Sequence, residues 1–193
     1  MRQLKYTKCA VICHGLSEYQ IAKYIKSNLH LKMELFSKDN GHSSIQITGL
    51  MDYLNNKRFT NLKAFSESCC IEYNKRKLID FKLFIIMDCD DCSQSQKNSF
   101  INKEMFNGHP LFDYIYPIVN TPNLENVLVK AGILVKKIKK DEKGDYYFKT
   151  FPIHEGPLSL DSYNEIVALR DKLSNVCQTN LEEFLTYCLN LVK

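Results

Sequence analysis

The sequence predicts an α/β fold: a four-stranded, mostly parallel central sheet flanked by helices, with a helical C-terminal extension. Two observations support this class. Strand-like and helix-like segments alternate over the first two thirds of the chain. The segment "DFKLFIIMD" (80–88) is a continuous apolar run between polar residues, which is typical of a strand covered on both faces, as in parallel sheets. Helices on both faces of such a sheet give a three-layer domain.

Hydrophobic periodicity and turn residues predict the individual elements. "SEYQIAKYIKSNL" is expected to be a helix with one apolar stripe, and Ser17 is its expected N-cap. Ser93 is expected to cap the helix at 93–106, and Gly132 is expected to end the helix at 123–133. The full expected order is strand 6–13, helix 17–29, strand 33–38, turn 39–44, helix 44–56, a mixed and partly helical segment 57–80, strand 80–88, helix 93–106, strand 114–119 and helix 123–133.

The pattern changes after residue 135. "KKIKKDEKGDYYFKTFPI" (136–153) predicts a hairpin or loop that turns at Lys143 and Gly144. Two helices, at about 159–175 and 179–192, are expected to follow. We therefore predict an α/β domain over residues 1–135, with residues 136–193 packing on that same domain.

Composition sets bounds on the class of protein. The 193 residues carry a formal net charge of +4, which allows an anionic partner without requiring one. The longest apolar runs fall far short of the ~20 residues of a membrane span, and no secretion signal follows the basic N-terminus. The eight cysteines are then expected to be reduced thiols in the cytoplasm. Cys89 and Cys92 have zinc-like spacing, but no second pair completes a zinc site.

The strongest chemical signal is "FIIMDCDDC", in which Asp88, Asp90 and Asp91 follow the apolar strand. Carboxylates gathered at a strand end repel one another unless a cation lies between them. Oxygen ligands favour Mg²⁺ or Mn²⁺. The alternative is a helix N-terminus with acidic residues, which the helix dipole stabilises. We favour a metal site.

A second signal is "CHGLSE", in which His14 and Gly15 follow the first strand. Histidine phosphatases have a similar Arg-His-Gly-x-Ser-Glu segment, but Cys13 stands at the arginine position. A thiol cannot form the bidentate hydrogen bonds with phosphate that arginine forms. An α/β-hydrolase requires Gly-x-Ser-x-Gly, and "GHSSI" (41–45) lacks the last glycine. Both alternatives are therefore weaker than a metal site, and the phosphatase remains the second alternative.

"VICHGLSEYQIAKYI" and "IIMDCDD" resemble, in order and spacing, the two motifs of Toprim domains. In that family a strand leads into Glu-Gly-x-x-[Ser/Thr]-[Glu/Asp] and a helix, and a later strand leads into Asp-x-Asp. "VNTPNLENVLV" (119–129) is similar to the third motif of the RloB-like branch, Ser-Asn-Pro-x-Phe-Glu. Asn120, Pro122 and Glu125 occupy the matching positions. The resemblance spans about residues 6–133.

The resemblance implies a Toprim-like fold and metal-dependent cleavage of phosphodiester bonds in DNA or RNA. It also implies a place in prokaryotic anti-phage defence, with an ATPase as a protein partner. Two Mg²⁺ or Mn²⁺ ions would activate a water and stabilise the leaving oxygen. The residues expected to hold them are Asp88, Asp90, Glu18 and either Asp91 or Glu125.

The chain departs from the family at His14, where active Toprim enzymes have a glutamate. Three outcomes stay open. His14 takes over the role, since a neutral imidazole binds Mn²⁺ and titrates near neutrality. Alternatively, Glu18 reaches back one helical turn in its place. In the third case the site is impaired, and the protein has a regulatory or interaction role.

Phosphate binding is expected next to these residues. Gly15 permits a tight turn, which lets the following helix direct its N-terminal amides at a phosphate. Lys38, Ser43 and Ser44, near the end of the second strand, are candidates for holding another phosphate. The alternative for these three residues is an ordinary solvent-exposed turn.

Overall fold

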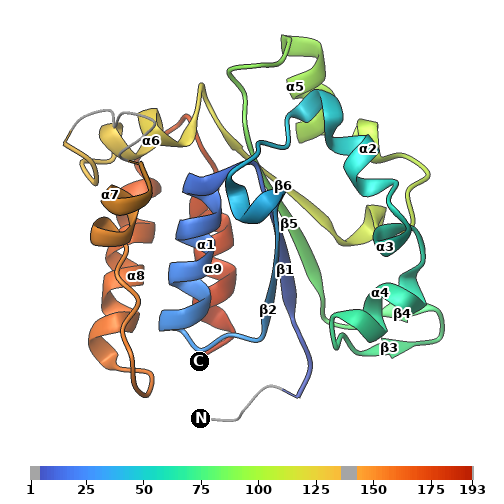
Figure 1. The fold of residues 1–193 in the computed structure, drawn as a ribbon, viewed down its shortest axis with the longest axis horizontal. Coiled ribbons are helices and arrows are strands. Elements are labelled where there is room, and N and C mark those ends of the chain that lie inside the picture. The colour runs from blue at the N-terminus through green and yellow to red at the C-terminus, as the bar shows by residue number, and fades with distance from the viewer. Residues whose placement is uncertain (1–4, 136–142, 193) are drawn as a thin grey trace.

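The computed structural model describes residues 5–135 and 143–192 and confirms the α/β class. Its central sheet has four strands in the order β2-β1-β5-β6 (Figure 1). Every neighbouring pair in this sheet is parallel, so the carboxyl ends of all four strands lie at one edge. The strands are β1 (Cys9–Cys13), β2 (Met33–Phe36), β5 (Lys82–Asp88) and β6 (Ile115–Asn120).

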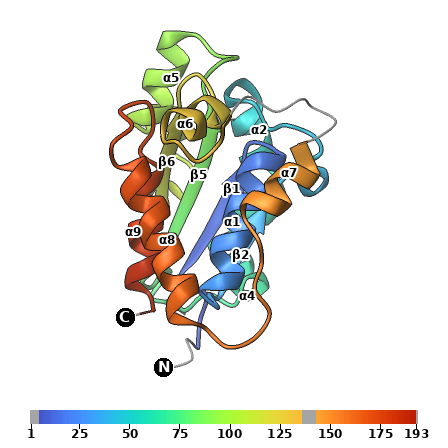
Figure 2. The ribbon, with the colours of Figure 1, turned by 90° about the vertical axis from the view of Figure 1, so that its left-hand side faces the viewer.

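Helices cover both faces of the sheet, as Figures 1 and 2 show. One face carries α1 (Leu16–Asn28), α6 (Leu124–Lys130), α7 (Lys143–Thr150), α8 (Leu160–Leu173) and α9 (Leu181–Asn190). The other face carries α2 (Leu50–Leu54), α3 (Lys57–Thr60), α4 (Leu62–Ser68), α5 (Gln94–Ile101) and a short hairpin, β3 (Tyr73–Asn74) with β4 (Lys77–Leu78). Short 3₁₀ turns complete the chain: η1 (Asp39–Gly41), η2 (Ile47–Gly49), η3 (Glu104–Phe106) and η4 (Phe112–Tyr114).

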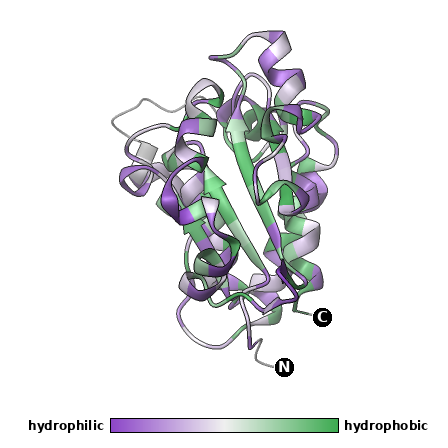
Figure 3. Ribbon diagram, turned by 90° about the vertical axis from the view of Figure 1, so that its right-hand side faces the viewer, coloured by the Kyte–Doolittle hydropathy of each residue, from purple (hydrophilic) through white to green (hydrophobic). Residues whose placement is uncertain are grey.

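The two central strands are buried on both faces. In β1, Val11 faces one apolar cluster while Ala10 and Ile12 face the other, and all five residues of the strand are inaccessible to solvent. Hydrophobic residues follow the strands in Figure 3. Each buried aliphatic side chain contributes about 1.5–3 kcal/mol. The apolar run at 80–88 is thus a central strand, as predicted.

The helix ends show one wrong and two correct predictions. Ser17 is not the N-cap of α1, because the helix begins one residue earlier and Gly15 occupies that position. The Glu18 carboxylate caps instead, accepting the Gly15 N–H at 2.9 Å. Ser93 does cap α5. Gly132 follows α6 with a φ of +65°, which suits a glycine that ends a helix.

The prediction of a hairpin or loop for residues 136–153 is wrong for the part of this segment that the structure describes. Residues 143–150 form α7, with Gly144 in its first turn, while residues 136–142 lie outside the described residues. Tyr147 is buried, and its ring lies 5.9 Å from that of Phe151. Phe151 in turn contacts Tyr24 of α1 with ring centroids 5.5 Å apart. Burial of this aromatic pair, spaced four residues apart, favours a helix over a hairpin.

All eight cysteines are free thiols. Cys9 and Cys13 are buried in β1, whereas Cys89 and Cys92 are half-buried beyond β5. In the parts of the chain that the structure describes, no helix has the length and apolar character needed to cross a bilayer.

Candidate functional site

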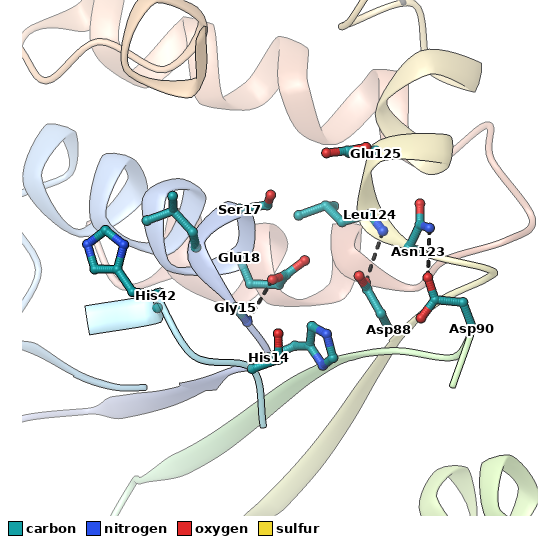
Figure 4. A pocket seen from close by; sticks show the side chains of 13 residues that line it. His14, Gly15, Ser17, Glu18, His42, Asp88, Asp90, Asn123, Leu124 and Glu125 are labelled. Carbon is teal, nitrogen blue, oxygen red and sulfur yellow. Dashed lines mark hydrogen bonds between the residues drawn. The ribbon is translucent and has the colours of Figure 1, made fainter. Parts of the chain in front are cut away.

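A pocket of about 490 Å³ opens at the carboxyl edge of the sheet. It lies between the β1–α1 turn, the end of β5 and the start of α6 (Figure 4). The pocket brings together seven of the residues predicted from the sequence: His14, Gly15, Glu18, Ser44, Asp88, Asp90 and Glu125.

His14 is held in one orientation at the end of β1. Its backbone N–H donates to the Ile86 carbonyl at 3.0 Å, and its ring Nδ1 lies 2.9 Å from the Ile45 carbonyl oxygen. A carbonyl oxygen can only accept a hydrogen bond, so Nδ1 carries the proton in the neutral ring. The lone pair is then on Nε2. This tautomer leaves Nε2 able to bind a metal or accept a proton.

Glu18 lies in the first turn of α1 and is only 2% exposed. Its hydrogen bond to the Gly15 N–H ties the carboxylate to the β1–α1 turn, where the helix dipole stabilises a negative charge. The turn packs tightly against η1. A Cβ on Gly41 would lie 2.8 Å from the Leu16 Cα. Gly41 has a φ of +90°, so both its conformation and its surroundings require glycine.

Asp88 ends β5 and accepts two hydrogen bonds on one oxygen. Its Oδ1 accepts from the Leu124 N–H at 2.9 Å and from the Asn120 amide at 3.3 Å. Within residues 5–135 and 143–192, no lysine or arginine forms an ion pair with Asp88. Burial, followed by the nearby charge of Glu18, raises the pKa of the Asp88 carboxyl to about 8. The ionised form is therefore disfavoured where no cation is bound.

Asp90 is fixed from the neighbouring α6 loop. The Asn123 amide donates to its Oδ2 at 2.9 Å. Asn123 is also the N-cap of α6, where its side chain accepts the Asn126 N–H. One side chain thus joins the end of the β5 segment to the start of α6.

Three predicted residues lie outside this pocket. Asp91 is not among its lining residues. Lys38 lines a separate cavity of about 520 Å³, which shares Ser44 with the main pocket. The Ser43 hydroxyl donates to the Asp39 carboxylate. Of the predicted second phosphate site, the structure therefore brings only Ser44 to the main pocket.

The donor set suits a hard divalent cation in its chemistry. Asp88, Asp90 and Glu18 offer carboxylate oxygens, and His14 offers Nε2, which are ligands that Mn²⁺ accepts. The pKa of Asp88 is raised mainly by burial and then by the charge of Glu18, and a nearby cation would favour the ionised carboxylate. Among the described residues, no three His, Cys, Asp or Glu side chains stand close enough to form a ready-made metal site. The fit to a cation is therefore one of side-chain chemistry and not of a preformed arrangement.

The sequence prediction missed several residues at this site. Asn123 and the Leu124 N–H orient the two aspartates, and His42 and Ser17 line the pocket. Asn120 ends β6 as Asp88 ends β5, so its position at a strand end is the same signal that identifies Asp88. Thr179, which bonds Asn120, carries no local signal, since 59 residues separate the two.

Comparison with protein-family models, with curated proteins and with solved structures finds no match to this chain. The fold and the pocket therefore carry the functional argument.

Proposed function

We propose that this protein is a Mg²⁺- or Mn²⁺-dependent hydrolase that cleaves phosphodiester bonds in nucleic acid, as its resemblance to Toprim domains implies. One observation carries the proposal. His14 and Glu18, from the β1–α1 turn and the first turn of α1, meet Asp88 from the end of β5 in one polar pocket at the carboxyl edge of the sheet. In open parallel α/β sheets this edge is where ligands bind.

Asp88, Asp90 and Glu18 would hold the cation, with His14 Nε2 or Glu125 as a further ligand. When bound, a divalent ion stabilises charge on phosphoryl oxygens and lowers the pKa of a coordinated water. The protein orients the carboxylates through the hydrogen bonds from Gly15, Leu124 and Asn123.

The β1–α1 turn would bind the substrate phosphate. Leu16 and Ser17 line the pocket at the N-terminus of α1, where backbone N–H groups point out of the helix. If His14 is not a ligand, its Nε2 is placed to accept a proton from the attacking water. The Nδ1 hydrogen bond to Ile45 would then stabilise the protonated ring.

A non-catalytic binding protein is the second candidate. It is favoured by the histidine at the first-motif position and by the lack of a ready-made three-residue metal group in the described residues. A histidine-type phosphatase has less support. No arginine or lysine among the described residues lines the pocket, and a phosphatase that works without a metal would need such a partner to neutralise the phosphate.

The test is cleavage of mixed DNA and RNA substrates in Mg²⁺, Mn²⁺ or EDTA, with Asp90→Asn and His14→Glu alongside the wild type. We expect cleavage with metal, none in EDTA, and loss of cleavage in Asp90→Asn. Cleavage gained only in His14→Glu would identify an impaired enzyme with a binding role. Phosphomonoester hydrolysis in EDTA, lost in His14→Ala, would identify the phosphatase.

A further inference from the structure

The orientation of Asp88 depends on a segment more than ninety residues further along the chain. Between α8 and α9 the chain returns to the sheet and pairs with the end of β6. Thr179 forms an antiparallel bridge with Asn120, and the Thr121 N–H donates to the Gln178 carbonyl at 2.9 Å. Figure 2 shows α9 beside β6, so this segment is part of the pocket's support.

A chain of hydrogen bonds leads from this segment to Asp88, and its direction is fixed. The Leu181 N–H lies 3.0 Å from the Thr179 hydroxyl oxygen, and a backbone N–H can only donate. The hydroxyl is therefore an acceptor there, and it donates its own hydrogen to the Asn120 Oδ1 at 2.9 Å. With its oxygen engaged, the Asn120 amide presents its NH₂ group to Asp88 Oδ1 at 3.3 Å.

The opposite orientation of Asn120 is strongly disfavoured. Asn120 is fully buried, so no bulk water compensates for a misplaced amide. A flipped amide would set its oxygen against Asp88 Oδ1, which still accepts the Leu124 N–H, and would leave the buried Asn120 oxygen without a donor, at a cost of about 1–3 kcal/mol. Thr179 thus determines that the NH₂ group of Asn120, and not its oxygen, points toward Asp88.

We propose that Thr179 and Asn120 are positioning residues that turn the Asp88 carboxylate toward the pocket. They hold Oδ1 together with the Leu124 N–H. The second oxygen, Oδ2, forms no hydrogen bond with any described residue and is left for a ligand. The role in metal binding rests on the proposed function, whereas the role in orienting the carboxylate does not.

The neighbouring Asn180 provides a matched control. Its side chain accepts from the Val119 N–H at 2.9 Å and donates to the Pro117 carbonyl at 3.1 Å. It therefore anchors the same segment to the same strand through two hydrogen bonds, without contacting Asn120 or Asp88. Removing it weakens the anchor and leaves the hydrogen-bond chain in place.

The first test is the affinity of the full chain for Mn²⁺, measured by electron paramagnetic resonance. In Thr179→Val we expect the affinity to fall about tenfold, the usual effect of removing an outer-shell partner. Thr179→Ser should restore it to within about twofold. Asn180→Ala should lower the melting temperature and leave the affinity unchanged. Equal losses in Thr179→Val and Asn180→Ala, or no loss in Thr179→Val, would overturn the proposal.

A second readout needs no metal. The side-chain amide of Asn120 gives its own ¹H–¹⁵N resonance, which reports its hydrogen bond to Asp88. We expect Thr179→Val and Asp88→Ala to shift this resonance, and Asn180→Ala to leave it in place. If the wild type binds no Mn²⁺, the proposed function fails, and the orienting role is decided by this resonance alone. If the chemical shift of the Asn120 side-chain amide does not change in Thr179→Val, the orienting role is overturned.

Discussion

The two halves of the pocket are built in different ways. At the end of β1, Glu18 is held by the Gly15 N–H three residues before it, and His14 is held by the Ile45 carbonyl 31 residues further along the chain. At the end of β5, Asp88 is held by Asn120, which is itself held by Thr179. The first half is thus held by contacts within residues 14–45, whereas the second half also needs Thr179 near the C-terminal end of the chain.

The largest effect is expected from a direct comparison of the two halves. Asp88→Asn should reduce metal-dependent cleavage by about 10³-fold or more, because it removes the charge of a central ligand. His14→Ala should reduce it by about 10²-fold, the lower end of the range for a general acid or base. Initial rates at saturating Mn²⁺ measure both. A larger loss of rate in His14→Ala than in Asp88→Asn would show that catalysis depends more on the β1 half of the pocket.

The next largest effect is a loss of stability from a substitution that affects only the β1 half of the pocket. Gly41→Ala should destabilise the protein by about 2–4 kcal/mol, since alanine is strained at positive φ and its Cβ would overlap the start of α1. Chemical denaturation measures the change. Gly49→Ala is the control, because a Cβ there meets nothing within 4 Å. Equal stability of the two variants would show that the β1–α1 turn does not depend on this close contact.

In the β5 half, the raised pKa of Asp88 should make the stability of the protein depend on pH. The pKa of Asp88 is raised to about 8 in the folded chain, against ~3.9 in an unfolded one. Between these values the folded state retains a proton that the unfolded state has released, so stability falls as pH rises. In EDTA, we expect Asp88→Asn to remove about 1–2 kcal/mol of the decrease between pH 5 and pH 8.

Asp113→Asn is the matched control for this pH experiment, because Asp113 is exposed to solvent and should leave the pH profile unchanged. A wild-type profile that is flat between pH 5 and pH 8, or one that Asp88→Asn does not alter, would contradict the prediction. Saturating Mn²⁺ should flatten the wild-type profile as well, because a bound cation favours the ionised carboxylate.

The smallest effect concerns Asp90. Asn123→Ser keeps an N-cap residue on α6 and removes the amide that donates to Asp90. We expect stability within about 0.5 kcal/mol of the wild type. Cleavage should fall about fivefold, which corresponds to the ~1 kcal/mol of one hydrogen bond. Asn123→Ala should lose both stability and activity. A fully active Asn123→Ser would show that Asp90 needs no support from α6.

The strands and most helices followed from the sequence because their signals are local. An apolar run such as residues 83–87 has few alternatives to a buried strand, and the rule that strand ends share one edge brought His14 and Asp88 together. The same rule applied to Asn120, whose neutral side chain nevertheless suggested no chemistry. Polar residues that orient others have no distinctive spacing, so they are found only once the packing is known.

The failures have a common physical cause. Segment 143–150 has glycine and charged residues in its first turn, which favour a turn locally, and its helix depends on burying Tyr147 against α1. Thr179 likewise acts through a contact with a strand 59 residues earlier. In both cases tertiary contact outweighs local preference, and a single sequence does not reveal which distant segments meet.

The pairing between Thr179 and Asn120 also bears on the order in which the protein matures during synthesis. A chain grows from its N-terminus, so the carboxylates at residues 18 and 88 leave the ribosome long before residues 178–181 do. The strand ends have time to come together first, and the donors that hold Asp88 through Asn120 arrive later. Before residues 178–181 are in place, Asp88 has the Leu124 N–H to hold it, whereas the Asn120 amide still lacks the Thr179 hydroxyl. The support that Asn120 gives to Asp88 is therefore the part of this site that depends on the last-made segment of the chain.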